Sequence, residues 1–202
     1  MEKQKFTKAA TIIDRILKIL QGFSIAGVIV SAIFIPLTLI FGEKIVVNSS
    51  KFEIGKVLSF DVNGDSFAFL NQSEIKLSIV VMLVAMIMIC LVYYRILKVF
   101  REVMAPMKEG NAFAEGISMK IKKLGWVVII GGTIAECCAA VAQMFQLRAY
   151  NWMAILDKNV VSNVQYDFSL DCNYIILGLV ILFLSFIFKY GEELQKEADE
   201  TL

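Results

Sequence analysis

The sequence predicts an all-α polytopic membrane protein with four transmembrane helices, and two observations carry this prediction. First, hydrophobic residues make up 58% of the 202 residues, while charged residues make up only 19%, below the quarter that is usual in soluble domains. Second, the charges are clustered, which leaves long stretches with one charge or none. About 20 apolar residues cross the hydrocarbon core of a bilayer, so these stretches can span it as helices.

The four expected spans are the apolar runs at about residues 19–42, 77–94, 124–147 and 172–188. The chain, residues 1–202, is then a single four-helix membrane domain. The first run exceeds the apolar length of a signal peptide and no clear cleavage motif follows it, so we expect it to stay as an anchor.

The segments between the spans differ in Lys and Arg content, and this difference predicts the orientation. The N-terminal segment, the 95–123 loop and the 189–202 tail share 14 of these cations, whereas residues 43–76 and 148–171 carry six. Cytoplasmic segments are the ones enriched in Lys and Arg. Both termini are therefore predicted to be cytoplasmic.

The two outer loops, 43–76 and 148–171, contain strand-like alternation of apolar and polar residues, and the first contains Asn63–Gly64, a strong hairpin signal. Because an isolated hairpin is marginal in water, we expect the two loops to pair into one small antiparallel β-cap on the extracytoplasmic side.

Helical periodicity continues beyond the spans on the cytoplasmic side. Residues 5–20 form an amphipathic segment that either lies on the inner leaflet or extends the first span. The second helix is expected to continue through 95–104, and the fourth into the tail.

One acid, Glu136, interrupts the third run. On a helix it shares a face of small and polar residues: Gly132, Glu136, Ala140 and Gln143. Such faces pack between helices, so we expect Glu136 to point into the protein as a neutral carboxyl bonded to a hydroxyl, with Thr133 and Ser31 as candidates, or to a backbone carbonyl. Structural or gating contact, ligand or partner contact and proton-coupled transport are the open alternatives.

The 95–123 loop carries a second amphipathic segment before the third span. Its apolar face comprises Phe113, Ile117, Ile121 and Leu124, and its basic residues are Lys120, Lys122 and Lys123. We expect an interfacial helix whose lysines contact anionic lipid headgroups or simply anchor the loop inside.

The tail carries five acids: Glu192, Glu193, Glu197, Asp199 and Glu200. Acids at a helix C-terminus oppose the macrodipole, so they do not favour the helix itself. This makes the tail a candidate contact for a partner.

The residue types argue against catalysis. The chain has no histidine, and the adjacent Cys137 and Cys138 provide too few ligands for a closed metal site. No phosphate loop or nucleophile motif is present. We expect no enzyme activity, no cofactor and no metal.

Two cytoplasmic stretches, "GNAFAEGISMKIKKLGW" and "IFKYGEELQKEADETL", resemble motifs of the DUF2975 family of bacterial four-helix membrane proteins. The matching positions are Gly110, Phe113, Lys120, Lys122, Lys123, Gly125 and Trp126, then Phe188, Gly191, Glu193, Leu194, Glu197, Asp199 and Thr201. The chain departs from the pattern at Ala112 and Ile117, where the family has proline and tends to have asparagine. The resemblance implies a multi-pass protein of the bacterial plasma membrane. It also implies a link to a small helix-turn-helix regulator, because the family's genes often neighbour one.

The first functional hypothesis is a membrane-embedded regulatory protein that senses a signal and controls or sequesters a cytoplasmic partner, with no direct contact to nucleic acid. The alternative is a transport or self-immunity protein acting on a peptide or small solute through the Glu136 face. Membrane lipids are expected partners in either case, and a homo-oligomer stays open.

Overall fold

The computed structural model describes residues 2–41, 51–54, 58–61, 72–111, 113–149 and 172–200. Its four long helices are α1 (Glu2–Phe41), α2 (Gln72–Lys108), α3 (Ile117–Ala149) and α5 (Asn173–Glu200). Each is long and apolar enough to cross a membrane. The four predicted helices are therefore confirmed, and so is the class of multi-pass membrane protein.

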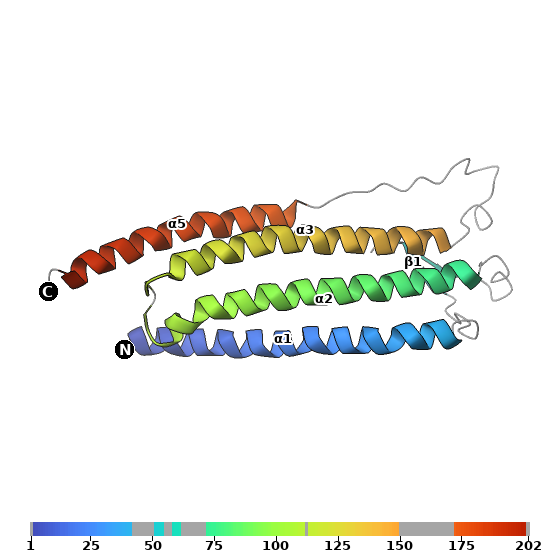
Figure 1. Ribbon diagram of the computed structural model, residues 1–202, viewed down its shortest axis with the longest axis horizontal. Coiled ribbons are helices and arrows are strands. Elements are labelled where there is room, and N and C mark those ends of the chain that lie inside the picture. The colour runs from blue at the N-terminus through green and yellow to red at the C-terminus, as the bar shows by residue number, and fades with distance from the viewer. Residues whose placement is uncertain are drawn as a thin grey trace.

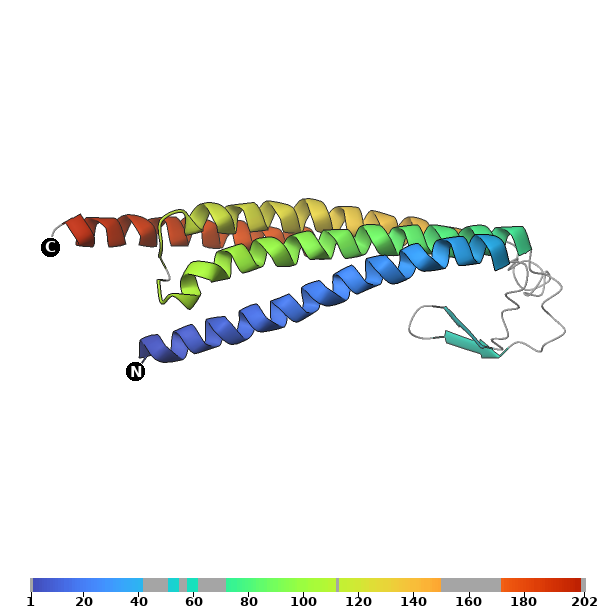
Figure 2. The same cartoon turned by 60° about the horizontal axis from the view of Figure 1, so that its bottom comes forward.

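The helices lie antiparallel to their neighbours in an open row rather than a closed ring (Figure 1). The extensive contacts join α1 to α2, α2 to α3 and α3 to α5, so that α1 and α5 form the two edges. The N and C ends of the chain lie at the same end of the row in both views (Figures 1 and 2). The connection between α2 and α3 lies there too, and we call this end the termini end.

The helices extend beyond the apolar runs, as the sequence predicts. Residues 5–20 are the continuous start of α1, which favours the extended span over a separate surface helix. The second helix runs through 95–104 and ends only at Lys108, past Pro106. The fourth continues into the tail as far as Glu200.

The last helix, α5, is displaced along α3 toward the termini end (Figure 1). A Cβ on Gly132 of α3 would collide with the ring of Tyr174, which places the start of α5 beside Gly132. Ala149, the last residue of α3, lies roughly 25 Å farther along its axis at 1.5 Å per residue. Consequently the C-terminal half of α3 lies beyond the start of α5, while the tail of α5 projects past α3 at the termini end (Figure 2).

A cluster of buried apolar side chains lies toward the termini end, where α2 and α3 meet. Its buried side chains are Val99, Val103, Ile117, Ile121, Leu124 and Val128. The predicted interfacial helix is therefore wrong: Ile117 is 0% exposed, and Ile121 and Leu124 also face protein rather than lipid. Periodicity alone cannot distinguish these two environments, because a lipid-facing face and a core-facing face are equally apolar.

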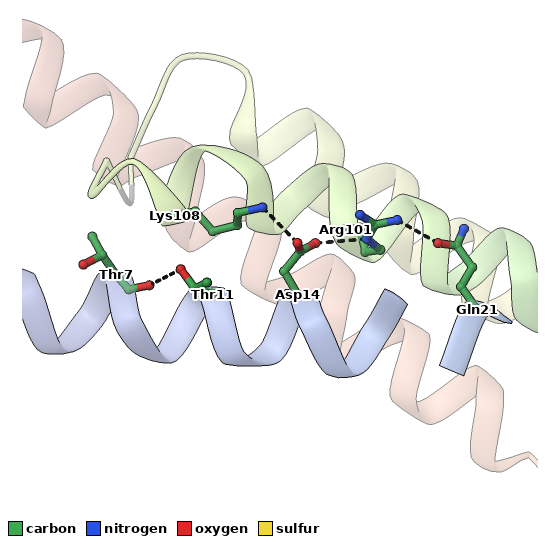
Figure 3. A network of polar contacts seen from close by, with 6 residues as sticks. All are labelled: Thr7, Thr11, Asp14, Gln21, Arg101 and Lys108. Atoms are coloured by element: carbon green, nitrogen blue, oxygen red, sulfur yellow. Dashed lines mark hydrogen bonds and ion pairs between the residues drawn. The ribbon is translucent and has the colours of Figure 1, made fainter. Parts of the chain in front are cut away.

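A polar network ties α1 to α2 at this end (Figure 3). The Arg101 guanidinium donates to Asp14 Oδ1 at 3.0 Å and to Gln21 Oε1 at 2.9 Å. The Lys108 ammonium donates to Asp14 Oδ2 at 2.9 Å. Each carboxylate oxygen of Asp14 thus accepts a hydrogen bond from α2. Arg101 and Lys108, which also count toward the orientation predicted from the sequence, therefore hold α1 and α2 together.

Two short strands, β1 (Lys51–Ile54) and β2 (Leu58–Asp61), pair as an antiparallel hairpin in the segment between α1 and α2. Its connection is 55–57, so Asn63–Gly64 is not the turn between these strands. The two strands contact each other extensively, and neither makes extensive contacts with a helix in the described part of the chain. The predicted cap formed from both loops depends on 150–171, which lies outside the described residues.

Candidate functional site

The connection between α2 and α3 is short and is bounded by two glycines with positive φ. Gly110, with φ 80°, ends α2: its N–H donates to the Met107 carbonyl at 3.1 Å, and the Asn111 N–H donates to the Pro106 carbonyl at 3.2 Å. These two bonds form a Schellman motif, which requires the left-handed conformation that glycine adopts most easily. Gly116, with φ 79°, directly precedes α3.

The N-terminus of α3 is capped by an acid of the tail. Glu192 Oε1 accepts from the Ser118 N–H at 2.6 Å, and Glu192 Oε2 accepts from the Gly116 N–H at 3.3 Å and the Ser118 hydroxyl at 3.1 Å. The first N–H groups of a helix have no partner within the helix, and its positive end favours a carboxylate. Because Gly116 has no side chain, the capping acceptor comes from α5 instead.

Phe113 fixes the connection against the tail. Its ring packs against the Phe188 ring at a tilt of 40° with the ring centroids 5.5 Å apart, and a Cβ on Gly191 would collide with it. The ring therefore fits only because residue 191 is glycine. Phe113 lies in the turn before α3, so the prediction that it shares a helical face with Ile117 is wrong.

We define the loop–tail site as residues 109–116 together with 188–200 of α5. It unites parts of both motifs that resemble DUF2975, through Phe113 on one side and Phe188 and Gly191 on the other. Gly110 belongs to the same connection. Thr201 lies outside the described residues.

A pocket of about 510 Å³ opens within the loop–tail site. Among its lining residues one ammonium, that of Lys196, faces five carboxylates: Glu115, Glu192, Glu193, Asp199 and Glu200. The Lys196 ammonium lies 3.9 Å from Glu200 Oε1, and the Lys189 ammonium lies 3.7 Å from Glu193 Oε1. All four side chains are largely exposed. Exposed pairs of this kind are weak, so the carboxylates can still attract a basic ligand.

The three predicted lysines belong to α3 and do not line this pocket. Lys120 is half-buried, while Lys122 and Lys123 are exposed. The Lys123 ammonium lies 3.5 Å from Glu102 of α2. The site thus separates an acidic pocket from a basic helix surface.

The Glu136 face is only partly enclosed. Gly132 is buried under Tyr174, Glu136 and Ala140 are half-buried, and Gln143 is exposed. Burial decreases along this face from Gly132 to Gln143 because α5 begins beside Gly132 and lies on the other side of it. The expected hydroxyl bond is not formed, because Thr133 donates to the Ile129 carbonyl of its own helix. Among the described residues, Glu136 has no hydrogen-bond partner.

Two tyrosines lie near this face. The hydroxyls of Tyr93 on α2 and Tyr174 on α5 are 2.9 Å apart and share a hydrogen bond. Glu136 lies one helical turn beyond Gly132, which packs against the Tyr174 ring. Three helices thus contribute one polar group each at the depth where α5 begins. Within the described part of the chain, no group of three metal-ligating side chains exists.

The fold and these two polar regions define a four-helix, multi-pass membrane protein with an acidic pocket at its termini end. The chain matches no family model, no curated protein and no solved structure at a significant level.

We expect Glu192→Gln to destabilise the protein by about 1–2 kcal/mol, because the capping carboxylate loses its charge at the start of α3. Glu193→Gln is the matched control, since it removes the same charge one residue away and leaves the cap intact. Thermal unfolding in detergent should show a lower midpoint for Glu192→Gln alone. Equal midpoints for the two variants would show that the cap does not stabilise the fold.

Proposed function

We propose that this protein is a membrane-embedded regulatory protein that binds a basic cytoplasmic partner at the loop–tail site. The observation that carries the proposal is the 510 Å³ pocket with its five carboxylates, built from the α2–α3 connection and the tail. The excess of Lys and Arg at this end supports its placement in the cytoplasm. Opposite charges guide such partners together and select among them.

The resemblance to DUF2975 supports a small helix-turn-helix regulator as the partner. DNA-binding domains carry a basic face that contacts phosphate. The pocket can bind that face in the absence of DNA, so membrane binding and DNA binding exclude each other. The protein itself then needs no contact with nucleic acid.

The continuity of α5 connects a signal to this site. One helix, Asn173–Glu200, carries both the contact with α3 in the span and the acids of the pocket. A signal that changes the packing of α5 on α3 would therefore move Glu192 and Phe188 relative to the connection. Such a shift controls the partner only if the partner prefers one of the two arrangements.

The test is co-purification from native membranes with the variant Glu193→Gln/Asp199→Asn/Glu200→Gln. This variant retains Glu192 and hence the cap, whereas truncation after Tyr190 would remove it. We expect partner binding to weaken roughly tenfold, because each exposed charge pair is worth about 0.2–1 kcal/mol, and to weaken further with salt. Glu109→Gln, in the α2–α3 connection but not in the lining of the pocket, should bind normally.

Retention of the partner by the triple variant would contradict the proposal, and so would the absence of any soluble partner at low salt. Transport or self-immunity would then be the better hypothesis. The observation that favours it is the group formed by Tyr93, Tyr174 and Glu136, which places polar atoms from three helices within the apolar region.

A further inference from the structure

A groove of about 620 Å³ runs between α2 and α3, on a part of the surface separate from the loop–tail site. Toward the outer end it is lined by apolar side chains that are 41–56% exposed: Met88, Leu91, Ile130 and Ile134. Gly131 lies in its lining, and a Cβ there would come within 2.9 Å of Val92. The two helices therefore approach closely beneath the groove, and its walls are open to acyl chains.

The other end of the groove, nearer the termini end, is basic. Arg95 and Lys98 of α2 and Lys123 of α3 line it, together with one acid, Glu102. Glu102 pairs with Lys123 at 3.5 Å. Among the described residues, Arg95 and Lys98 have no ion-pair partner, so two cations remain uncompensated.

Trp126 also lines the basic end and is 50% exposed. Tryptophan is enriched where the hydrocarbon core meets the headgroups, because its ring is apolar and its N–H is polar. Long basic side chains reach toward the same boundary from within a span. The groove thus extends from the hydrocarbon depth to the headgroup depth of one leaflet.

We propose that this groove binds a phospholipid with an anionic headgroup. An acyl chain lies along Met88, Leu91 and Ile130, while the phosphate and the headgroup charge contact Arg95 and Lys98. Basic pockets between transmembrane helices at headgroup depth bind anionic lipids in this way. Charge complementarity selects an anionic lipid over a zwitterionic one, and this site is independent of the partner proposed for the loop–tail site.

The test measures lipid retention by the purified full chain in mixed micelles of phosphatidylglycerol and phosphatidylcholine with identical acyl chains. Native mass spectrometry counts the bound molecules of each. Arg95→Gln/Lys98→Gln is the informative variant, because it leaves the pair of Glu102 and Lys123 intact. Arg15→Gln/Lys18→Gln is the control: it removes the same charge from α1, toward the same end and outside the groove.

The wild-type chain should retain phosphatidylglycerol in preference to phosphatidylcholine by roughly tenfold or more. The groove variant should lose most of that preference, and the α1 control should keep it. Arg95→Lys, which conserves the charge, should also keep it. The proposal is overturned if the wild type shows no preference, or if the α1 control loses as much as the groove variant, because the preference would then be a general effect of net charge.

Discussion

Gly178→Leu is expected to separate α3 from α5 and to destabilise the protein strongly. A Cβ at position 178 would collide with Ile129 and come within 2.9 Å of the Gly125 carbonyl oxygen. The reverse contact is also close, since a Cβ on Gly125 would lie 3.1 Å from the Gly178 carbonyl oxygen. Because backbone atoms cannot rotate away as a side chain can, the helices themselves must move apart.

Overpacking of this kind costs about 1–3 kcal/mol or more, which corresponds to roughly 3–10 °C in the melting midpoint of a chain this size. Gly22→Leu on α1 is the matched control, because a Cβ there meets nothing within 4 Å. Thermal unfolding in detergent compares the two. Similar midpoints for both variants would mean that α3 and α5 do not pack through these glycines.

Glu136→Lys is expected to prevent correct folding, whereas Glu136→Gln should fold with near-normal stability. Glu136 is half-buried in the middle of α3, and the four apolar runs contain no other acid that could pair with a lysine. A cation at the centre of a span costs about 2.5–3.5 kcal/mol on insertion scales. Glutamine keeps the shape and polarity of a neutral carboxyl, so it should avoid that cost.

Gln143→Lys provides the matched control on the same helix. Residue 143 is exposed and near the C-terminal end of α3, where a lysine can extend to the interface. All three variants are compared by their membrane insertion and by their yield of monodisperse protein. If Glu136→Gln were as damaging as Glu136→Lys, the acid would have to be ionised and paired, and its assignment as a neutral polar group would be wrong.

The positions of the four helices could be predicted because hydropathy is a local property of the sequence. Even their extensions, through 5–20, 95–104 and the tail, follow from uninterrupted helical periodicity. Hydropathy does not predict how far one helix is displaced along another. The displacement of α5 depends on close contacts such as Gly125 with Gly178 and Gly132 with Tyr174. Because of this displacement Gln143 is exposed, although the sequence predicts that it lies on an interior face.

The contacts of the candidate site were harder to predict because they join distant parts of the chain. Glu192 and Ser118 are 74 residues apart, so local capping patterns do not reveal their bond. One signal was available: Gly116 precedes a helix and has no side chain to cap it, which requires an acceptor from elsewhere. Similarly, Asp14 reads as one charge on an amphipathic segment until Arg101 and Lys108 of α2 surround it.

We expect the loop–tail site to face the cytoplasm and the loops at the other end to face outward. Single cysteines report this directly when they are labelled in intact cells with a thiol reagent that does not cross membranes, in a background lacking Cys172. We expect Ser50→Cys and Asn163→Cys to be labelled, and Lys108→Cys and Glu200→Cys to be labelled only after the membrane is opened. Labelling of Lys108→Cys or Glu200→Cys in intact cells would contradict this orientation, because the acidic pocket would then be out of reach of any cytoplasmic partner.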